Sequence, residues 1–222
     1  MSTLSLASSL LDGCIQTMHP AARVSIQALP QCPDIRLWLV EPNSMKRQFS
    51  QDEILRIQEY PAYWAFCWAS GQVLAREILA NPHWVKGKKV MDFGAGSGVV
   101  AIACVLAGAR EVIACDIDGD ALLSCHENAQ LNNVTYRTHG DLFDFDEPLE
   151  LLIAADVLYD RANLPLLECF REKADHVLVA DSRIKHFDFP PYQEIGNQTS
   201  CTVPDLDELN EFRHVRLYSA GE

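Results

Sequence analysis

Between residues 88 and 182 the chain alternates between short, mostly apolar segments and segments with helical spacing. We expect strands at 88–93, 111–115, 135–141, 149–157 and 176–182, and helices at 97–107, 119–133 and 162–174. Strands that are apolar along their length need cover on both faces, and the helices between them supply it. The alternation therefore predicts an α/β fold with a doubly wound, mostly parallel sheet.

Two further strand-like stretches, 197–203 and 212–220, follow without a convincing helix between them. Parallel neighbours need a long crossover connection, whereas antiparallel neighbours do not. We therefore expect these stretches to pair antiparallel at the C-terminal edge of the sheet, which brings the number of strands to seven.

Residues 1–60 are expected to form an N-terminal extension of a core at 61–222, within a single domain. Residues 1–20 are compatible with a short helix or with disorder. Residues 24–29 and 34–40 alternate in polarity on either side of a turn that contains proline, which predicts a hairpin or two short strands.

Two helices are predicted between this hairpin and the core alternation. Ser50 and Glu53 have the spacing of a capping box, so a helix should begin after Ser50. Residues 62–81 have the character of a buried helix that stops before a proline. In such a helix Trp64 and Trp68 would stand at i and i+4 and share one face.

The charge of the chain limits its partners. It has 18 Lys and Arg against 31 Asp and Glu, a net charge of −13. Proteins that bind nucleic acid obtain much of their affinity from Lys and Arg contacts to phosphates, so we expect no nucleic-acid partner. A neutral or basic partner suits this charge, although acidity also serves solubility alone.

Cysteine and histidine usage bounds the chemistry and the compartment. Eight cysteines contain no CxxC pair, and seven histidines are scattered singly, so we expect no metal site.

No stretch approaches the ~20 apolar residues of a membrane span. The first basic residue is Arg23, so the N-terminus lacks the charged start of a signal peptide. We expect a cytoplasmic protein without a membrane partner.

The segment 89–103, KVMDFGAGSGVVAIA, joins an expected strand to an expected helix through three glycines at alternate positions. Ligands of open parallel sheets bind beyond the carboxyl ends of the strands, where glycine lets the backbone approach closely. A phosphate-binding P-loop would need lysine after Gly98, and the dinucleotide fingerprint would need glycine at Val99. A tight turn without a ligand is the plain alternative.

The pattern Asp92-x-Gly94-x-Gly96-x-Gly98 resembles motif I of the class I, seven-β-strand S-adenosylmethionine (SAM) methyltransferases, which have a Rossmann-like fold. The resemblance implies that Asp92, Gly94 and Gly96 line the aminocarboxypropyl end of SAM. S-adenosylhomocysteine would be the product. An acidic residue suits the ammonium and sulfonium of this cofactor.

Two later acids extend the resemblance. Asp116 ends the second strand, where these enzymes place an acid that accepts hydrogen bonds from the ribose hydroxyls. A helix cap is the alternative role, but Asp118 is the better candidate for that cap. By resemblance, Asp141 reaches the adenine amino group with help from the backbone at Leu142. Its alternative role is that of a turn residue.

The fourth strand ends in Ala154-Ala155-Asp156-Val157-Leu158-Tyr159, whose Asp-x-x-Tyr form resembles the seven-β-strand protein lysine methyltransferases. Residues 32–40, 63–79 and 177–183 also look like the branch that contains the lysine methyltransferase of electron-transfer flavoprotein β-subunit and its bacterial "nicotinamide N-methyltransferase-like" relatives. Ala155 replaces the glycine usual there and is counted with the expected cofactor-binding residues. The segment after Arg183 is unusually short.

The chemistry assigns roles to this element. Methyl transfer is an in-line displacement, and catalysis consists mostly of positioning a neutral, desolvated amine. Asp156 would capture and orient the incoming ammonium, since its charge raises the amine pKa and opposes a strong general-base role. Tyr159 would form one wall of the amine channel. The alternatives are that Asp156 caps the following turn and that Tyr159 packs in the core.

Two further features remain open. By resemblance, Trp68 contacts the cofactor, although Trp64 and Trp68 would also serve simply to pack their helix on the sheet. The acidic residues between 141 and 160, which include Asp144, Asp146, Glu147 and Glu150, form either a solvated rim or a collar that attracts a lysine-bearing surface.

The hypothesis from sequence is a SAM-dependent N-methyltransferase that methylates lysine side chains of a protein, and that acts as a monomer. Its first rival is a small-molecule N-methyltransferase acting on a pyridine or an amine. The second is a binding protein that keeps the fold without catalysis, and an oxidoreductase is disfavoured by Val99. The substrate identity, the number of methyl groups and the role of residues 1–30 stay open.

Overall fold

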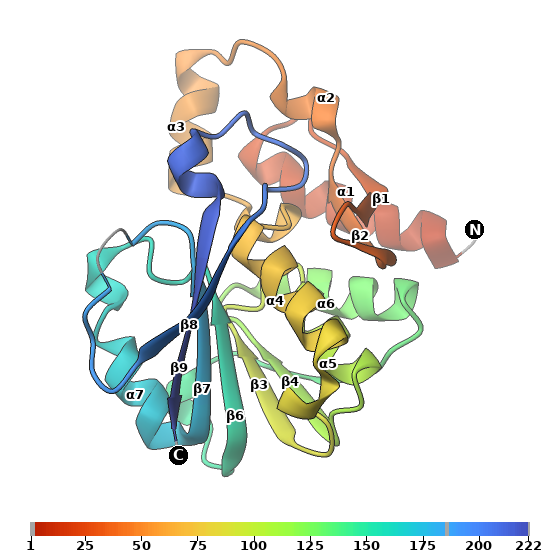
Figure 1. The fold of residues 1–222 in the computed structure, drawn as a ribbon. Helices are drawn as coiled ribbons and strands as arrows, with labels where there is room; N and C mark the ends of the chain where they lie inside the picture. The colour runs from red at the N-terminus through yellow and green to blue at the C-terminus, as the bar shows by residue number, and fades with distance from the viewer. Residues whose placement is uncertain (1–2, 185–186, 222) are drawn as a thin grey trace.

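A seven-stranded sheet forms the centre of the molecule, with its strands in the order β5-β4-β3-β6-β7-β9-β8 (Figure 1). The structure is a computed structural model that describes residues 3–184 and 187–221. The strands are β3 (Lys89–Phe93), β4 (Glu111–Cys115), β5 (Arg137–His139), β6 (Leu149–Ala155), β7 (Ala174–Asp181), β8 (Gln193–Thr199) and β9 (His214–Gly221). Strands β3 to β7 run parallel, and β9 runs antiparallel to β7 and β8. The predicted α/β sheet with an antiparallel C-terminal edge is confirmed.

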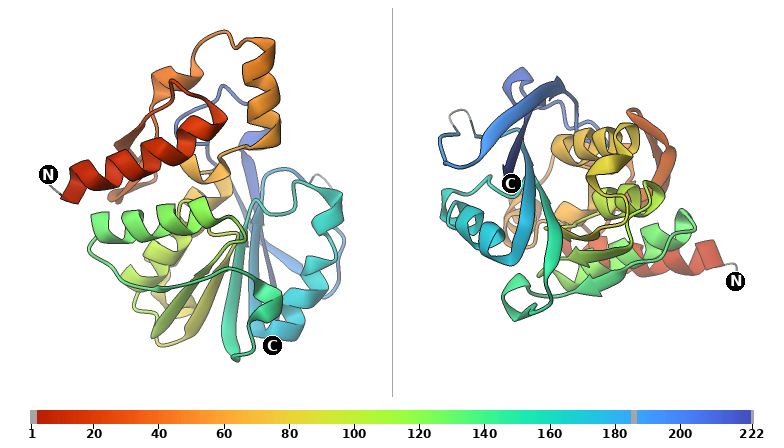
Figure 2. Two further views of the ribbon diagram at one scale, coloured as in Figure 1. Left: turned by 180° about the vertical axis from the view of Figure 1, so that it is seen from behind. Right: turned by 60° about the horizontal axis from the view of Figure 1, so that its bottom comes forward.

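Helices cover both faces of this sheet (Figure 2). One face carries α4 (Ala69–Ala80), α5 (Val99–Leu106) and α6 (Gly119–Leu131), and the other carries α7 (Leu166–Lys173). Alternation along β7 shows the two layers. Val177 and Val179 pack with Phe170 of α7, whereas Leu178 and Ala180 belong to the core beneath α4 and α5. The sheet is therefore doubly wound, as expected from its apolar strands.

The N-terminal extension is ordered over the described residues. Its elements are α1 (Thr3–Met18), β1 (Val24–Leu29), β2 (Cys32–Val40), α2 (Pro42–Met45) and α3 (Gln51–Glu59). β1 and β2 pair antiparallel, which confirms the hairpin. The capping box is also confirmed, since the Ser50 hydroxyl accepts a hydrogen bond from Glu53 N and Glu53 Oε2 accepts one from Ser50 N at 2.8 Å.

Helix α1 answers the question that the sequence left open at residues 1–20. Leu11 and Ile15 are buried in a cluster with Trp38 of β2 and Leu131 of α6. The main-chain N–H of Trp38 donates to Asn128 Oδ1 at 2.7 Å, which ties the extension to α6. Helix α1 is thus stabilised by burial of one face against the core rather than by its own propensity.

The helix predicted at 62–81 is wrong in its first third. Residues Tyr63–Ala65 form a short 3-10 turn, η1, and α4 begins only at Ala69. Cys67 is extended and exchanges both backbone hydrogen bonds with Val203. Trp64 and Trp68 therefore do not share a helix face. The start of α4 is set from outside the segment, because Asp156 accepts the N–H of Ser70 at 2.9 Å.

The tail differs in detail from its prediction. The first tail strand, β8, begins at Gln193 rather than 197, and it forms the edge of the sheet, while β9 lies one place inside it.

Across residues 3–184 and 187–221, no helix has the length and hydropathy needed to cross a membrane. The same residues contain no cluster of three or more His, Cys, Asp or Glu side chains that could hold a metal ion.

Candidate cofactor and acceptor site

The glycine loop connects the end of β3 to the start of α5. Gly94, Gly96 and Gly98 have φ angles of +68°, +51° and +76°, in the left-handed region that favours glycine. A methyl group added at Gly98 would lie 2.6 Å from the Tyr136 hydroxyl oxygen. One added at Gly94 would lie 2.7 Å from a methyl of Val157. The loop therefore needs glycine both for its backbone shape and for its close contacts.

Replacing Gly98 by alanine should lower the free energy of unfolding by about 1–3 kcal/mol, because strain at positive φ adds to a steric clash. Urea unfolding measures this loss. Gly119→Ala is the matched control, since a methyl group there would meet no atom within 4 Å, and its φ is not positive. Equal stability of the two variants would contradict the account of the loop.

Asp92 lies beneath the glycine loop. Its side chain is buried, at 2% exposure, and its carboxylate accepts the N–H of Ala101 at 2.9 Å in the first turns of α5. Burial raises the pKa of Asp92 to about 7, against the effect of this hydrogen bond. The structure thus places Asp92 as a support of the loop and of α5. Direct contact with the aminocarboxypropyl group stays a prediction that this burial does not favour.

The stability of the fold should therefore depend on pH through Asp92. The folded state binds a proton more tightly than the unfolded chain, whose Asp pKa is about 3.9, so stability falls as pH rises from about 4 to about 7. Asp92→Asn removes this contribution, and relative to the parent it should gain about 2–3 kcal/mol between pH 5 and pH 8. Urea titrations of both proteins at both pH values measure the gain. An equal change of unfolding free energy with pH in the variant and the parent would contradict it.

Asp116 holds the loop from the end of β4. Its Oδ2 accepts the N–H of Gly96 at 2.9 Å, and its Oδ1 accepts the N–H of Asp118 at 3.0 Å. Burial raises its pKa, and these two donors partly offset the shift. The cap of α6 is Asp118, which accepts the N–H of Asp120 at 2.9 Å. The prediction that Asp118 rather than Asp116 caps this helix is confirmed. Asp116 as the ribose ligand stays a prediction.

The loop after β5 carries the next expected residues. Asp141 caps a short 3-10 turn, η3 (Leu142–Asp144), and accepts the N–H of Phe143 at 2.9 Å. The Leu142 side chain is buried in the core, so only its backbone is available to a ligand. Two apolar side chains near the expected cofactor acids, Phe143 and Ile117, are 63% and 89% exposed, and neither is among the residues predicted from sequence. In the sequence Ile117 directly follows Asp116, and Phe143 lies two residues after Asp141.

Asp156 follows the last residue of β6, Ala155, and has a φ of +51°. Its carboxylate accepts four hydrogen bonds: from Ser70 N at 2.9 Å, Ser70 Oγ at 2.7 Å, Ser182 N at 3.1 Å and Ser182 Oγ at 2.7 Å. Asp156 therefore joins the start of α4 to the end of β7. The following turn is capped by Asp160 instead, so the alternative that Asp156 caps that turn is wrong.

Aromatic side chains gather beside Asp156. Tyr159 is 59% exposed, so the alternative that it packs in the core is wrong. Its ring centroid lies 5.7 Å from that of Tyr63, which the sequence analysis did not single out. The indole N–H of Trp68 donates to the backbone oxygen of Tyr63 at 3.0 Å. Trp64 is buried, and its Cα would lie 3.9 Å from a methyl group added at Gly96.

For the acidic residues between 141 and 160 the sequence left two alternatives, a solvated rim or a collar around the site. Glu147 pairs with Lys89 and Arg137, and Glu150 pairs with Arg110. Lys89 is the first residue of β3, so these pairs lie at the opposite end of the strand from the glycine loop. Glu147 and Glu150 therefore do not belong to the site, and the collar is wrong for these two residues.

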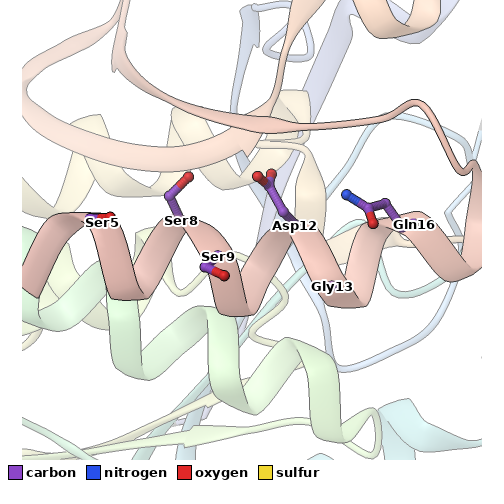
Figure 3. Close-up of a pocket in the computed structure, with 6 residues that line it drawn as sticks. All are labelled: Ser5, Ser8, Ser9, Asp12, Gly13 and Gln16. Carbon is purple, nitrogen blue, oxygen red and sulfur yellow. The ribbon is translucent and has the colours of Figure 1, made fainter. Parts of the chain in front are cut away.

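A separate depression runs along α1 (Figure 3). Its lining residues are Ser5, Ser8, Ser9, Asp12, Gly13 and Gln16. Asp12 is engaged in the fold, since its carboxylate accepts the N–H of Val24 at 2.7 Å. None of the expected site residues lines this depression.

Comparison with known proteins identifies the family. The model described as ribosomal protein L11 methyltransferase (PrmA) matches residues 77–160. The electron transfer flavoprotein beta subunit lysine methyltransferase of Xenopus laevis is 33% identical over 171 residues, which are 73% of this chain and 68% of that protein. This chain belongs to the same family of class I methyltransferases. The family resemblance predicted from the Gly94–Gly98 loop and the Asp156–Tyr159 element is thus confirmed.

The match is shorter for other members of the lysine methyltransferase family. The rat protein of the same description is 35% identical over 127 residues, 54% of this chain and 50% of that protein. The chain thus spans about half the length of several curated relatives that it matches. A ribosomal protein L11 methylase from Lactobacillus delbrueckii has a TM-score of 0.51 at 22% identity, covering 69% of this chain and 78% of that one. This likeness supports the fold alone.

Proposed function

We propose that this chain is a SAM-dependent N-methyltransferase that methylates lysine side chains of a protein. The observation that carries the proposal is the meeting of two elements at the carboxyl ends of β3, β4 and β6. One is the glycine loop, which Asp116 fastens through Gly96, and the other is the Asp156–Tyr159 element. Sites of this fold class form at that end of a parallel sheet.

The residues present fit SAM. The glycine loop brings backbone without side chains to the end of β3, and at Gly96 a methyl group would meet no atom outside its chain neighbours closer than 3.9 Å. Asp116 and Asp141 stand at the ends of neighbouring strands. Carboxylates suit ribose hydroxyls, an adenine amino group and a cationic ligand, whereas a diphosphate would need positive charge. When bound, SAM supplies a methyl group on a positively charged sulfur. We assign Gly94, Gly96, Asp116, Asp141, the Leu142 backbone, Ala155 and Trp68 to its binding.

Asp156 is the residue that we assign to binding of the acceptor amine. Two of its four hydrogen bonds come from Ser70 and two from Ser182, so the carboxylate is held in one orientation before an amine arrives. A fixed carboxylate positions an ammonium well, while its charge keeps the amine pKa high. We therefore assign Asp156 to capture and orientation, with loss of the amine proton to solvent before transfer. Tyr159 forms a wall of the channel.

The relatives' description provides a candidate substrate, the beta subunit of electron transfer flavoprotein. A protein acceptor agrees with a net charge of −13, which favours a lysine-bearing surface over an acidic one. We further propose a cytoplasmic monomer without a nucleic-acid partner. The acidic charge disfavours a nucleic-acid partner, and the eight free cysteines favour the cytoplasm, since free thiols are typical of reducing compartments.

Labelled SAM tests the proposal. The purified chain is incubated with methyl-labelled SAM and either electron transfer flavoprotein beta subunit or a cell extract that is then divided into protein and small-molecule fractions. We expect base-stable label in protein. Label confined to small molecules would replace the proposal by a small-molecule N-methyltransferase, and SAM binding without any transfer would favour a non-catalytic binding protein.

A further inference from the structure

Two exposed tyrosines from distant parts of the chain face each other at the site. Tyr63 belongs to η1 and Tyr159 follows β6, and they are 48% and 59% exposed. Their ring centroids lie 5.7 Å apart, and their planes are inclined by 52°. The inclined pair therefore presents aromatic surface from both rings to the solvent.

The pair stands between the two elements that the proposed reaction brings together. Tyr63 immediately precedes Trp64, whose backbone lies against Gly96 of the glycine loop. Tyr159 lies three residues beyond Asp156. The two rings therefore belong to the chain segments that carry the neighbour of the glycine loop and the proposed acceptor carboxylate.

The Tyr63 ring is held in place by its neighbours. The Trp68 and Tyr63 rings pack in a T-shaped pair with 5.9 Å between centroids, and the Trp68 N–H donates to the Tyr63 backbone oxygen. The Arg183 guanidinium lies over the Trp68 ring, 5.9 Å from its centroid. Arg183 is itself fixed by an ion pair with Glu208. The Tyr63 ring is thus organised before a ligand binds, which reduces the entropy lost on binding.

The charges around the pair favour a cation. Burial raises the pKa of the Tyr159 phenol most, and the neighbouring Tyr63 adds to this shift. The negative charges of Asp160 and Asp116 raise it further. Within the part of the chain that the structure describes, cation–π contacts occupy Phe49, Phe145, Trp68 and Phe212, and none occupies the two tyrosines. About half of each tyrosine side chain is exposed, so each ring has surface available to a cation from another molecule.

We propose that Tyr63 and Tyr159 form a two-ring site for the ε-ammonium group of the acceptor lysine, with Tyr63 as a specificity-determining residue. An ammonium within about 6 Å of an aromatic face is attracted by the ring quadrupole, and two faces and nearby carboxylates add to the attraction. The inference rests on the proposed function for the identity of the cation. It adds a residue from η1 to an acceptor site so far built from β6.

Ligand binding tests the proposal without requiring turnover. The probe is Nα-acetyl-Nε-trimethyl-lysine, added to protein saturated with S-adenosylhomocysteine and followed by NMR. Tyr63→Ala should weaken binding of this probe at least fivefold, while Tyr63→Phe, which keeps the ring, should stay within twofold of the parent. Tyr60→Ala is the control, since Tyr60 is 65% exposed and lies three residues away on the same chain segment. A neutral tert-butyl analogue of the probe should bind at least fivefold more weakly than the cation.

Three results would overturn the proposal: no binding of the probe to the parent protein, equal binding by Tyr63→Ala and the parent, or equal affinity for the cation and its neutral analogue. Calorimetry with S-adenosylhomocysteine checks that Tyr63→Ala retains the fold and the cofactor site. The outcome is separate from that of the labelling assay. Methylated protein with an unaffected Tyr63→Ala variant would refute the two-ring site alone, whereas probe binding without methylated protein would refute the proposed reaction alone.

Discussion

Replacing Asp116 by alanine should weaken SAM binding about a hundredfold. The carboxylate accepts the N–H groups of Gly96 and Asp118, so its loss frees the glycine loop at its central residue. Its predicted bonds to the ribose hydroxyls would be lost as well. Charge-assisted hydrogen bonds contribute about 1.5–3 kcal/mol each, and a hundredfold change in Kd corresponds to about 2.7 kcal/mol. Isothermal calorimetry with SAM measures the change.

Asp118→Ala is the matched control for this experiment. Asp118 lies two residues away and caps α6 through Asp120, so its loss should cost about 1 kcal/mol of stability. SAM binding by this variant should stay within a few-fold of the parent, because Asp118 is not an expected ligand. If both variants lost SAM to the same extent, the effect would belong to the start of α6 rather than to the Asp116 carboxylate.

Replacing Asp156 by asparagine should reduce methyl transfer at least a thousandfold and leave SAM binding within a few-fold. The variant keeps the size of the side chain but loses the charge that we assign to capture of the ammonium. It also places an amide donor where a carboxylate oxygen now accepts from Ser70 or Ser182, so the free energy of unfolding should fall by about 1–3 kcal/mol. Turnover, calorimetry and urea unfolding separate these three effects.

Ser182→Ala serves as the control for the structural part of that loss. It removes one hydrogen bond, which the hydroxyl donates to Asp156 at 2.7 Å, while the backbone N–H still donates to Asp156 and the charge remains. We expect a stability loss of about 1 kcal/mol and less than a tenfold loss of transfer. Near-normal transfer by Asp156→Asn would show that the carboxylate only fastens α4 to β7.

The parts of the fold that sequence predicts well are those with local causes. The strands from 88 to 182 are defined by apolar runs and by the helices between them, and the capping box at Ser50 depends on Glu53 three residues away. The start of α4 was predicted wrongly because it depends on Asp156, a residue 86 positions from Ser70. Helix α1 stayed undecided because its buried face has its partner, Trp38, on β2.

The site divides in the same way. The glycine loop and the acids at strand ends could be placed from sequence, because parallel strands bring their carboxyl ends to one edge. The contacts that each acid makes could not be predicted from sequence, since the direction of a side chain depends on tertiary packing. Asp92 supports α5, and Asp156 joins α4 to β7. Tyr63 escaped notice because its partner, Tyr159, is distant in sequence.

The measurement that tests the central claim most directly is peptide mass spectrometry of a cell extract treated with the purified chain and SAM carrying a deuterated methyl group. The account predicts deuterated methyl-lysine in one or a few proteins, present with the parent chain and lost with Asp156→Asn. Deuterated methyl groups found only in small molecules, or only on protein residues other than lysine, would contradict it.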